Sequence, residues 1–183
     1  MKPLLRFEGV ALRRGGRLLF EQFDLALGPG EALQVTGPNG SGKSSLIRLA
    51  GGLLREELGR VERSPLALAD DNIALDRELP LSRALAFWRG AVAEAMTQLS
   101  IAHLAHVPVR LLSSGQLKRA ALARVAASGA PLWLLDEPLN ALDSDGAARL
   151  TALIDGHRAI GGAVLAASHQ PLPGNWQQLE LKA

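Results

Sequence analysis

The chain of 183 residues contains no cysteine and no tyrosine. Without cysteine it cannot form a disulfide framework, a thiolate metal site or a cysteine nucleophile. It has no apolar run near the roughly 20 residues that span a bilayer, and its start, MKPLLRFEGVALRR, does not have the apolar core of a signal peptide. We therefore expect the protein to fold in the compartment where it is made, and to work at a membrane only beside a separate membrane subunit.

A large excess of charge is also missing. The chain has 20 basic and 18 acidic residues, a net charge of +2, and no Lys/Arg run exceeds two residues. This pattern does not favour a nucleic-acid partner. The hydrophobic fraction of 48% and the charged fraction of 21% are typical of globular proteins, and the length fits one domain spanning residues 1–183.

Strands are favoured in the N-terminal third. Apolar segments at residues 4–12, 18–20 and 23–27 flank Arg13-Arg14-Gly15-Gly16, which indicates a hairpin turn. A further short strand is expected at 31–36. Residues 61–68 are weakly strand-like.

Helices and buried strands alternate in the rest of the chain. Helical periodicity covers residues 45–54, 81–99, 116 to about 127, and 143–157. Short apolar runs at 131–135 and 163–167 suit buried parallel strands. The alternation predicts an α/β fold.

The strongest motif is GPNGSGKS at residues 37–44, which fits GxxxxGK[ST] between a strand and a helix. Glycines let backbone N–H groups turn toward phosphates, and the helix N-terminus attracts anions. Lys43 is predicted to reach the β- and γ-phosphates of ATP and Ser44 to ligate Mg²⁺. A glycine-rich turn could fit by chance, but the flanking elements argue against it. The predicted ATP-binding residues here are Gly37, Pro38, Asn39, Gly40, Ser41, Gly42, Lys43, Ser44 and Ser45.

A second motif is LWLLDE at residues 132–137, a buried strand that ends in two carboxylates. Ligands of open α/β sheets bind at the carboxyl ends of the strands. Asp136 is therefore predicted to hold Mg²⁺, and Glu137 to polarise an attacking water. The alternative for an isolated Asp-Glu pair is an acidic helix N-terminus.

A third motif, LSSGQ, contains Ser113, Ser114, Gly115 and Gln116 and alone would indicate only a helix cap. In this order, however, the set resembles the ATP-binding subunits of ABC transporters, whose signature is LSGGQ. The phosphate loop, the signature, Asp-Glu, Leu142-Asp143 and His169 follow the family order, and the resemblance extends from about residue 4 to 181. Ser114 departs from the family glycine.

The resemblance implies a fold and a mechanism. The fold is a P-loop NTPase domain of the ABC type, with an N-terminal antiparallel β subdomain, a RecA-like core and a small helical signature subdomain at approximately 73–128. Two copies pair head to tail as a homodimer, so that the signature residues act in trans on ATP held by the partner. The resemblance further implies that Asp143 lies at the dimer seam and that Glu137, His169 and Lys43 are catalytic.

Two further departures concern Arg14 and Asn72. The family usually stacks adenine on an aromatic ring just before the Gly15-Gly16 turn, where this chain has Arg14. A guanidinium plane can stack on a purine in its place. The family also has a Mg²⁺-contacting glutamine where Asn72, one methylene shorter, falls nearest in register. Other residues nearby could take either role.

In three local features the chain resembles the ATP-binding subunit of the bacterial haem exporter of cytochrome c maturation. They are the non-glycine Ser114, Asp145-Gly146, and Gln170-Pro171-Leu172 directly after the histidine. Such a subunit is peripheral, on the cytoplasmic face of the inner membrane, and works with integral membrane subunits. Its ATP hydrolysis releases a haem-loaded chaperone, and it is not expected to contact haem directly.

Alternatives to this interpretation are another ABC exporter, a soluble ABC-type ATPase, and a nucleotide-binding module that does not hydrolyse ATP. Glu137 and His169 argue against the last. Phe87 and Trp88 are predicted to line a docking groove for the membrane subunit, the alternative being that they pack the helical subdomain. Three histidines match no motif and are expected to be ordinary core or surface residues: His103, His106 and His157.

Overall fold

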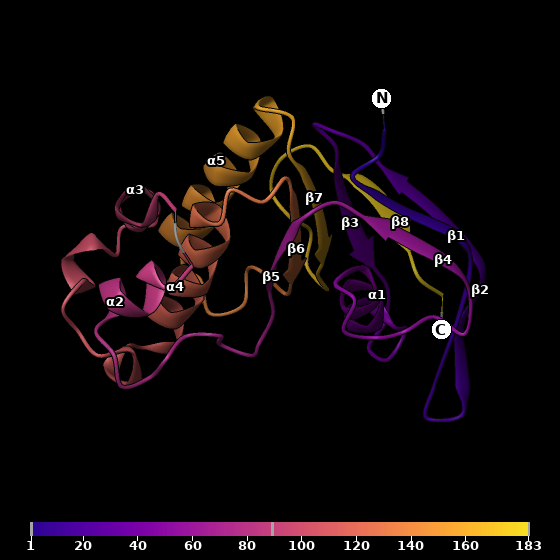
Figure 1. The fold of residues 1–183 in the computed structure, drawn as a ribbon, viewed down its shortest axis with the longest axis horizontal. Coiled ribbons are helices and arrows are strands. Elements are labelled where there is room, and N and C mark those ends of the chain that lie inside the picture. The colour runs from indigo at the N-terminus through magenta and orange to yellow at the C-terminus, as the bar shows by residue number, and fades with distance from the viewer. Residues whose placement is uncertain (1, 89, 183) are drawn as a thin grey trace.

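Two sheets and their flanking helices make up the computed structural model, which describes residues 2–88 and 90–182 (Figure 1). A three-stranded antiparallel sheet has the order β2-β1-β4, and a five-stranded parallel sheet has the order β5-β6-β7-β3-β8. The strands are β1 (Leu5–Arg14), β2 (Arg17–Leu27), β3 (Ala32–Thr36), β4 (Leu58–Arg63), β5 (Leu66–Ala69), β6 (Leu132–Asp136), β7 (Ala163–Ala167) and β8 (Gln177–Glu180). The α-helices are α1 (Lys43–Ala50), α2 (Leu81–Ala86), α3 (Val92–Gln98), α4 (Ser114–Ala127) and α5 (Ser144–Ala159).

The antiparallel sheet begins with the expected hairpin. Arg14 pairs with Arg17 across Gly15-Gly16, and both glycines have positive φ, as a tight two-residue turn requires. Strand β4 then pairs with the other edge of β1. The predicted α/β architecture with an N-terminal antiparallel sheet is thereby confirmed.

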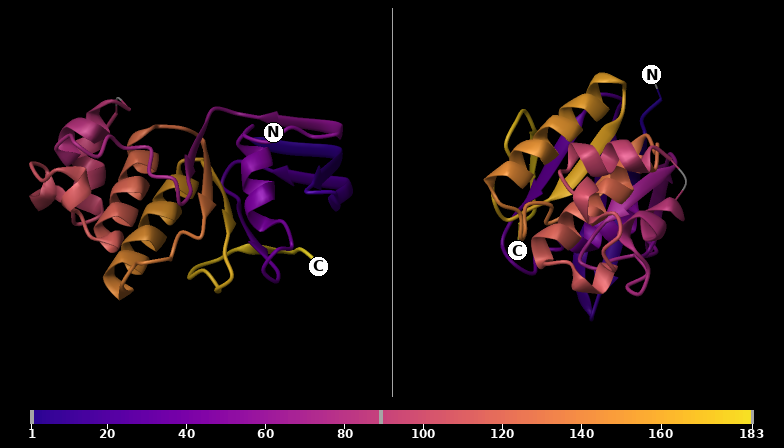
Figure 2. Two further views of the ribbon diagram at one scale, coloured as in Figure 1. Left: turned by 90° about the horizontal axis from the view of Figure 1, so that it is seen from below. Right: turned by 90° about the vertical axis from the view of Figure 1, so that its left-hand side faces the viewer.

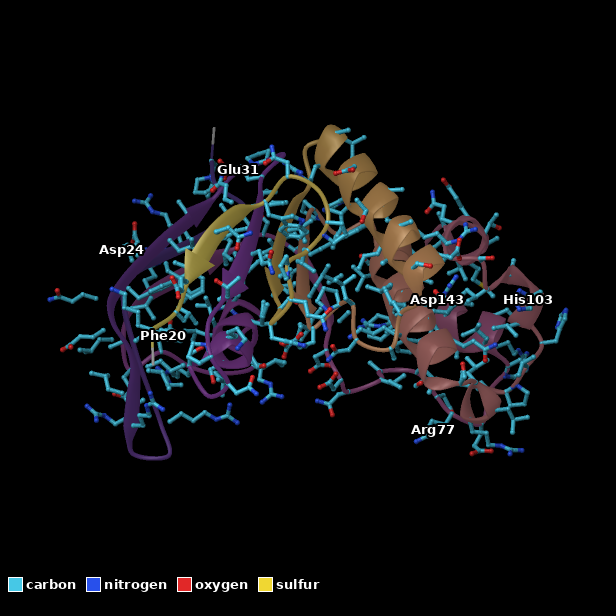
Figure 3. All side chains as sticks on the ribbon, turned by 180° about the vertical axis from the view of Figure 1, so that it is seen from behind. Phe20, Asp24, Glu31, Arg77, His103 and Asp143 are labelled. Atoms are coloured by element: carbon cyan, nitrogen blue, oxygen red, sulfur yellow. The ribbon has the colours of Figure 1, made fainter. Side chains whose placement is uncertain are left out.

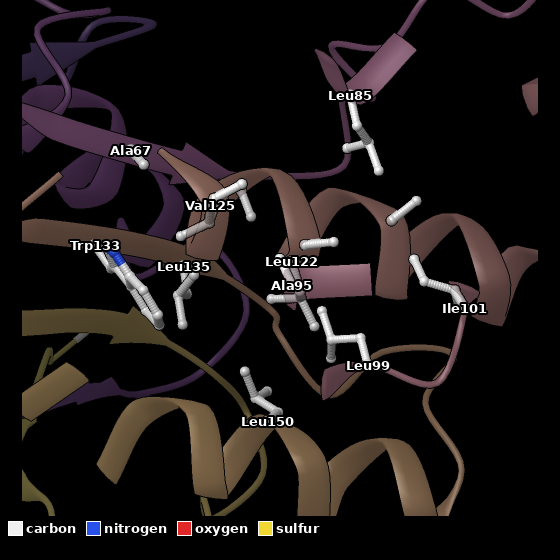
Figure 4. Close-up of a cluster of buried hydrophobic side chains, with 14 of the residues drawn as sticks. Ala67, Leu85, Ala95, Leu99, Ile101, Leu122, Val125, Trp133, Leu135 and Leu150 are labelled. Atoms are coloured by element: carbon white, nitrogen blue, oxygen red, sulfur yellow. The ribbon is translucent and has the colours of Figure 1, made fainter. Parts of the chain in front are cut away.

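Buried side chains of the parallel sheet alternate between two hydrophobic clusters, one on each face. In β6, Leu132 and Leu134 enter the cluster shared with α1 and the antiparallel sheet, whereas Trp133 and Leu135 enter the cluster shared with α4 and α5. Figure 4 shows the second cluster, which includes Leu122 and Val125 of α4 and Leu135 of β6. A fully buried leucine of this kind contributes about 1.5–3 kcal/mol, so both faces are needed for stability.

Helices α2, α3 and α4 gather at one end of the molecule, and the antiparallel sheet with α1 lies at the other (Figures 1 and 2). This helical end falls within the segment predicted as the signature subdomain, approximately 73–128. That division into subdomains stays a prediction. No helix in the described ranges is long and apolar enough to cross a membrane.

The helix expected over residues 81–99 is two helices instead, α2 and α3, so that prediction was wrong. Gly90 lies between them, and a Cβ added there would be 1.8 Å from the backbone oxygen of Ala127 in α4. Apolar residues at helical spacing occur on both sides of this break, which explains why the sequence read as one helix.

The segment at 61–68 is also divided, into β4 and β5, which belong to different sheets. The backbone N–H of Ser64 donates to the oxygen of Leu4, which directly precedes β1 of the first sheet, while the oxygen of Pro65 accepts from Leu132 in the second. Since proline has no N–H to donate, it suits this change of sheet.

The helix expected at 45–54 begins earlier and ends earlier, as α1. It ends at Gly51-Gly52, where Gly52 has φ of 73°, and Leu53 is 60% exposed rather than on the apolar stripe. Its start at Lys43 joins the phosphate-loop motif directly to the helix N-terminus. Strand β8 was not predicted.

Candidate active site

Three adjacent parallel strands deliver the motif residues to one edge of the sheet. Strands β6, β7 and β3 are neighbours, and they end at Asp136, Ala167 and Thr36. The phosphate-loop motif follows β3, Glu137 follows β6, and His169 lies two residues beyond β7. This is the edge where open α/β sheets bind ligands.

The loop 37–42 curls around the side chain of Lys43. The Lys43 Nζ donates to the backbone oxygens of Gly37 at 2.7 Å and Pro38 at 3.0 Å, and the side chain is buried. Gly37 (φ 137°) must be glycine, because a Cβ there would lie 2.4 Å from the oxygen of Leu181. Asn39 and Gly40 at the tip of the loop are exposed.

Helix α1 starts at this loop, and no side chain in the described part of the structure caps it, so its first N–H groups are available to an anion. Gly42, at the N-cap, has φ of 102°, and a Cβ there would lie 3.2 Å from the ring of Phe20. The hydroxyl of Ser41 is buried and has no hydrogen-bond partner within residues 2–88 and 90–182. A buried, unsatisfied hydroxyl beside an anion-binding helix end is a natural phosphate contact.

Ser44 and Asp136 meet across the sheet edge. The Ser44 hydroxyl donates to Asp136 Oδ1 at 3.1 Å, and Asp136 is 6% exposed. Burial raises the pKa of the Asp136 carboxyl above its ordinary value, and the Ser44 hydrogen bond opposes this effect. A hydroxyl and a buried carboxylate in contact are hard oxygen ligands suited to a divalent cation.

Glu137 faces His169. The Glu137 Oε2 lies 2.8 Å from His169 Nδ1, and Gln170 Nε2 lies 3.2 Å from His169 Nε2. Glu137 has φ of 46°, a left-handed conformation that non-glycine residues rarely adopt, and its backbone N–H donates to Ala167 in β7 at 2.8 Å. The strained turn directs the Glu137 carboxylate toward the end of β7.

Lys118 of α4 also reaches this edge, although the sequence motifs did not single it out. Its Nζ donates to the backbone oxygen of Asp136 at 3.2 Å. Burial lowers the pKa of Lys118, and the carboxylates of Asp71, Asp136, Glu137 and Asp70 act in the opposite direction. In the sequence, the only feature that pointed to Lys118 was its position two residues after the signature.

The signature residues form the start of α4. The Ser113 hydroxyl accepts from the Gln116 backbone at 3.3 Å, and Gln116 Oε1 accepts from the Ser113 backbone at 2.9 Å, a capping box. A Cβ on Gly115 would lie 2.8 Å from the oxygen of Ala141. Ser114 is exposed, which is consistent with its departure from the family glycine.

A hollow of about 490 Å³ adjoins this cap and is lined in part by Ser113, Gly115 and Asp143. Asp143 caps α5 by accepting from the Gly146 backbone at 2.8 Å. Arg119 of α4 pairs with Asp143 at 2.5 Å and with Asp145 at 2.9 Å. The Gly146 hydrogen bond and the Arg119 contact lower the pKa of the Asp143 carboxyl.

Arg14 and Asn72 lie in different settings. One guanidinium nitrogen of Arg14 donates to the Ser45 hydroxyl at 3.2 Å, which holds Arg14 beside the first turn of α1. Asn72 is held in a turn by Asp70, through its backbone N–H at 3.0 Å and its side-chain amide at 3.3 Å. The structure therefore brings Arg14 to the phosphate-loop helix, whereas the Asn72 amide group is engaged by Asp70.

The remaining candidates lie outside this edge. Phe87 is 78% exposed and contacts Trp88 edge to face, and the guanidinium carbon of Arg124 lies over the Trp88 ring, 4.7 Å from its centre. His157 is buried and stacked on Trp133 at 3.8 Å. Burial lowers the pKa of His157. His103 and His106 are exposed.

The two groups of motif residues lie apart within the chain. In Figure 3, Phe20, which packs against Gly42, and Asp143 appear toward opposite ends of the molecule. The first group could bind phosphate, a divalent cation and an attacking water. The second presents a helix N-terminus with an exposed hydroxyl to the surroundings.

The comparisons with known proteins agree with this geometry. The family model described as ABC transporter matches residues 20–140. A cytochrome c biogenesis ATP-binding export protein CcmA from Sphingopyxis alaskensis is 58% identical over 177 residues, covering 92% of this chain and 91% of that protein. The protein of the same name from Novosphingobium aromaticivorans is 55% identical, covering 89% and 87%.

Solved structures show the same fold. A dimeric bacterial ABC transporter cassette superposes with a TM-score of 0.84 at 22% identity, covering 97% of this chain and 94% of that one. An ATP-binding subunit of an ABC transporter superposes with a TM-score of 0.83 at 20% identity, covering 91% and 79%. The family match covers more than half of the chain and the curated relatives cover about nine-tenths of it. The chain belongs to the ABC transporter family, as one of its ATP-binding subunits.

Proposed function

We propose that this chain is the ATP-hydrolysing subunit of a bacterial ABC exporter that serves cytochrome c biogenesis, the process named in its relatives. One observation carries the proposal. An anion cradle, a hydroxyl–carboxylate pair and a glutamate–histidine pair converge at the carboxyl ends of β3, β6 and β7. Those three parts are what phosphoryl transfer to water requires.

ATP binding begins at the phosphate loop. Lys43 is held by two backbone oxygens of the loop, and the phosphates of ATP offer charged acceptors in their place. The Ser41 hydroxyl and the first N–H groups of α1 add donors. Arg14, beside α1, is proposed to stack on adenine.

Mg²⁺ fits the Ser44–Asp136 pair, because burial disfavours the charge of Asp136 and a cation would stabilise it. When bound, the ion neutralises charge on the β- and γ-phosphates. No group of three acidic or histidine side chains in the described segments could hold a metal alone. Phosphate and water oxygens are expected to complete its ligands, with the Asn72 side-chain oxygen as a further contact.

Hydrolysis is assigned to Glu137 and His169. The Glu137 carboxylate orients the attacking water and accepts a hydrogen bond from it. His169 donates to Glu137 from Nδ1, which holds the carboxylate in place. We further propose that, once ATP is bound, the imidazolium form of His169 keeps the Nδ1–H contact to Glu137 and donates from Nε2 to the γ-phosphate.

A second copy completes each site. The signature cap lies with Asp143, away from the phosphate loop of its own chain, so a head-to-tail partner would bring Ser113, Ser114, Gly115 and Gln116 to the γ-phosphate. As a cap, the Ser113 hydroxyl uses an acceptor lone pair and keeps its proton for a phosphate oxygen. Asp143 would then lie at the seam.

Integral membrane subunits are the proposed partners, at the cytoplasmic face of the inner membrane. The exposed Phe87 and the half-exposed Trp88 are the proposed contact. The coupled step is release of a haem-loaded chaperone, and haem itself does not contact this chain. Support for this step comes from the sequence features at Ser114, Asp145-Gly146 and Gln170-Pro171-Leu172.

The test is Glu137→Gln, purified from native membranes with and without Mg-ATP and followed by mass spectrometry of its partners. The variant should bind ATP, form a dimer and lose turnover by about a hundredfold or more, because the water loses its base. Lys43→Met is the control that should trap no dimer. Recovery of multi-spanning haem-handling proteins supports the export role.

Other outcomes would change the proposal. Recovery of a different permease would keep the ATPase and overturn the cytochrome c assignment. Recovery of soluble partners alone would overturn the transporter role. Wild-type protein that binds ATP beside its partners but never turns over would indicate a non-hydrolysing module.

A further inference from the structure

Gln34 is a fully buried amide in the middle of β3, at 0% exposure, between the apolar residues Leu33 and Val35. Burying an amide costs free energy unless it is hydrogen-bonded. Its bonds go to residues 136 to 144 positions later. Gln34 Nε2 donates to the Gln170 oxygen at 2.7 Å, and Gln34 Oε1 accepts from the Leu172 backbone at 3.2 Å and from Gln178 Nε2 at 3.1 Å.

Those bonds fix the backbone directly after His169. On the other side of His169, the Ser168 backbone donates to Val35 in β3 at 3.1 Å. The Ser168 hydroxyl also accepts from the Gln170 backbone at 3.1 Å. His169 therefore lies at the apex of a short bend whose two sides are both attached to β3, one by backbone and one by the Gln34 side chain.

The same bend orients the imidazole ring. The Glu137 carboxylate can only accept hydrogen bonds, so the proton between Glu137 and His169 belongs to His169 Nδ1. In the neutral ring, His169 Nε2 is then an acceptor, and the Gln170 side-chain amide lies 3.2 Å away to donate to it. Gln34 holds the backbone of Gln170 by a hydrogen bond. It therefore also determines the position of the Gln170 side-chain amide relative to the His169 ring.

We propose that Gln34, acting through Gln170, is a positioning residue that fixes the place and the ring tautomer of His169 relative to Glu137. The inference rests on the proposed function, which assigns hydrolysis to this pair. Among the described residues, the hydrogen bonds of the buried Gln34 side chain go to Gln170, Leu172 and Gln178 and none goes to Lys43, Ser44 or Asp136, so its effect on turnover passes through the His169 bend.

The test compares Gln34→Met, Gln170→Leu and Gln178→Met in the full chain. Gln34→Met keeps length and loses all three hydrogen bonds. Gln170→Leu is an exposed substitution that removes only the contact to the ring. Gln178→Met is the matched control, because it removes one bond of Gln34 and leaves the two bonds to Gln170 and Leu172.

Two readouts separate positioning from a general loss of stability. ATP turnover should fall about tenfold in Gln34→Met and Gln170→Leu with the KM for Mg-ATP within about twofold, since a misplaced catalytic group lowers kcat rather than binding. The ¹⁵N resonances of the His169 ring, assigned by their loss in His169→Gln, should move away from the Nδ1–H tautomer pattern in both variants. Gln178→Met should match the wild type in both readouts.

Wild-type kcat and an unchanged His169 ring signal in Gln170→Leu would overturn the inference, and this holds even where Gln34→Met does not fold. Wild-type turnover in His169→Gln would instead overturn the assignment of His169 to hydrolysis. The ring signals of Gln34→Met and Gln170→Leu would still decide whether Gln34 positions the histidine.

Discussion

The two motif-bearing ends of this chain are held in place by different means. At the phosphate-loop end, Lys43 and Asp136 are buried, and their partners are the loop backbone and Ser44. At the signature end, Asp143 and Asp145 are exposed and are held by Arg119 and the caps of two helices. The first end is organised by the core, whereas the second is organised on the surface, where a partner can reach it.

The largest expected effect comes from a mixed dimer in which one chain has a defective phosphate-loop end and the other has a defective signature end. Lys43→Met disables the phosphate-loop end. Ser113→Asp keeps a good N-cap but sets a negative charge against the phosphate. Each variant alone should lose about a hundredfold of ATP turnover or more. Mixed together, they should recover about a quarter of wild-type turnover, because half of the dimers carry one intact composite site of two.

The matched control is Lys43→Met mixed with a Lys43→Met,Ser113→Asp double variant, which has no intact site in any pairing. Turnover is measured against total protein as the ratio of the two chains is varied. Absence of recovery in a mixture that forms heterodimers would show that the signature does not act in trans.

A smaller effect distinguishes two neighbouring positions of the signature. Gly115→Ala should lower turnover about tenfold, because its Cβ would press on the Ala141 oxygen at 2.8 Å and shift the segment that leads to Asp143. Ser114→Gly should lower turnover less, by about threefold, because the exposed Ser114 hydroxyl is lost while the first helical N–H groups stay in place. Steady-state ATPase assays check both. Equal losses in the two variants would contradict a constraint specific to Gly115.

The smallest effect concerns His157, which belongs to neither end. Burial against Trp133 lowers the pKa of His157 in the folded chain. As the pH falls, His157 is therefore protonated more readily in the unfolded chain than in the folded chain. Stability should therefore fall as the pH drops below about 6.5, by at most about 1.4 kcal/mol per pH unit. His157→Gln should flatten this slope in urea unfolding curves from pH 5 to 8, whereas the exposed His103→Gln should not. A slope that persists in His157→Gln would assign it to other groups.

Local motifs made much of the phosphate-loop end predictable. A glycine-rich loop between a strand and a helix, and an apolar strand ending in Asp-Glu, carry their chemistry in consecutive residues. The proximity of the glycine-rich loop and the Asp-Glu pair could be expected, because neighbouring parallel strands end at one edge of a sheet.

Features that depend on distant contacts were not predictable. The break at Gly90 is explained by the approach of Ala127, the reach of Lys118 by the packing of α4, and the buried bonds of Gln34 by residues more than 130 positions away. Strand β8 has the pattern QQLE, with three exposed residues, and pairs only because β3 offers a free edge. The spacing of apolar residues within these segments does not indicate contacts with residues far away in the sequence.

The division of the core into two clusters has a consequence for how the molecule opens. Among the residues that the structure describes, no side chain is shared between the cluster around α1 and the cluster around α4 and α5, because the parallel sheet separates them. If α4 and α5 loosen from the sheet, the cluster beneath them becomes exposed while the cluster around α1 stays buried. The two clusters would then behave as two cooperative units with separate hydrogen-exchange protection. The helical end can thus fluctuate while the loop 37–42 and α1 stay packed.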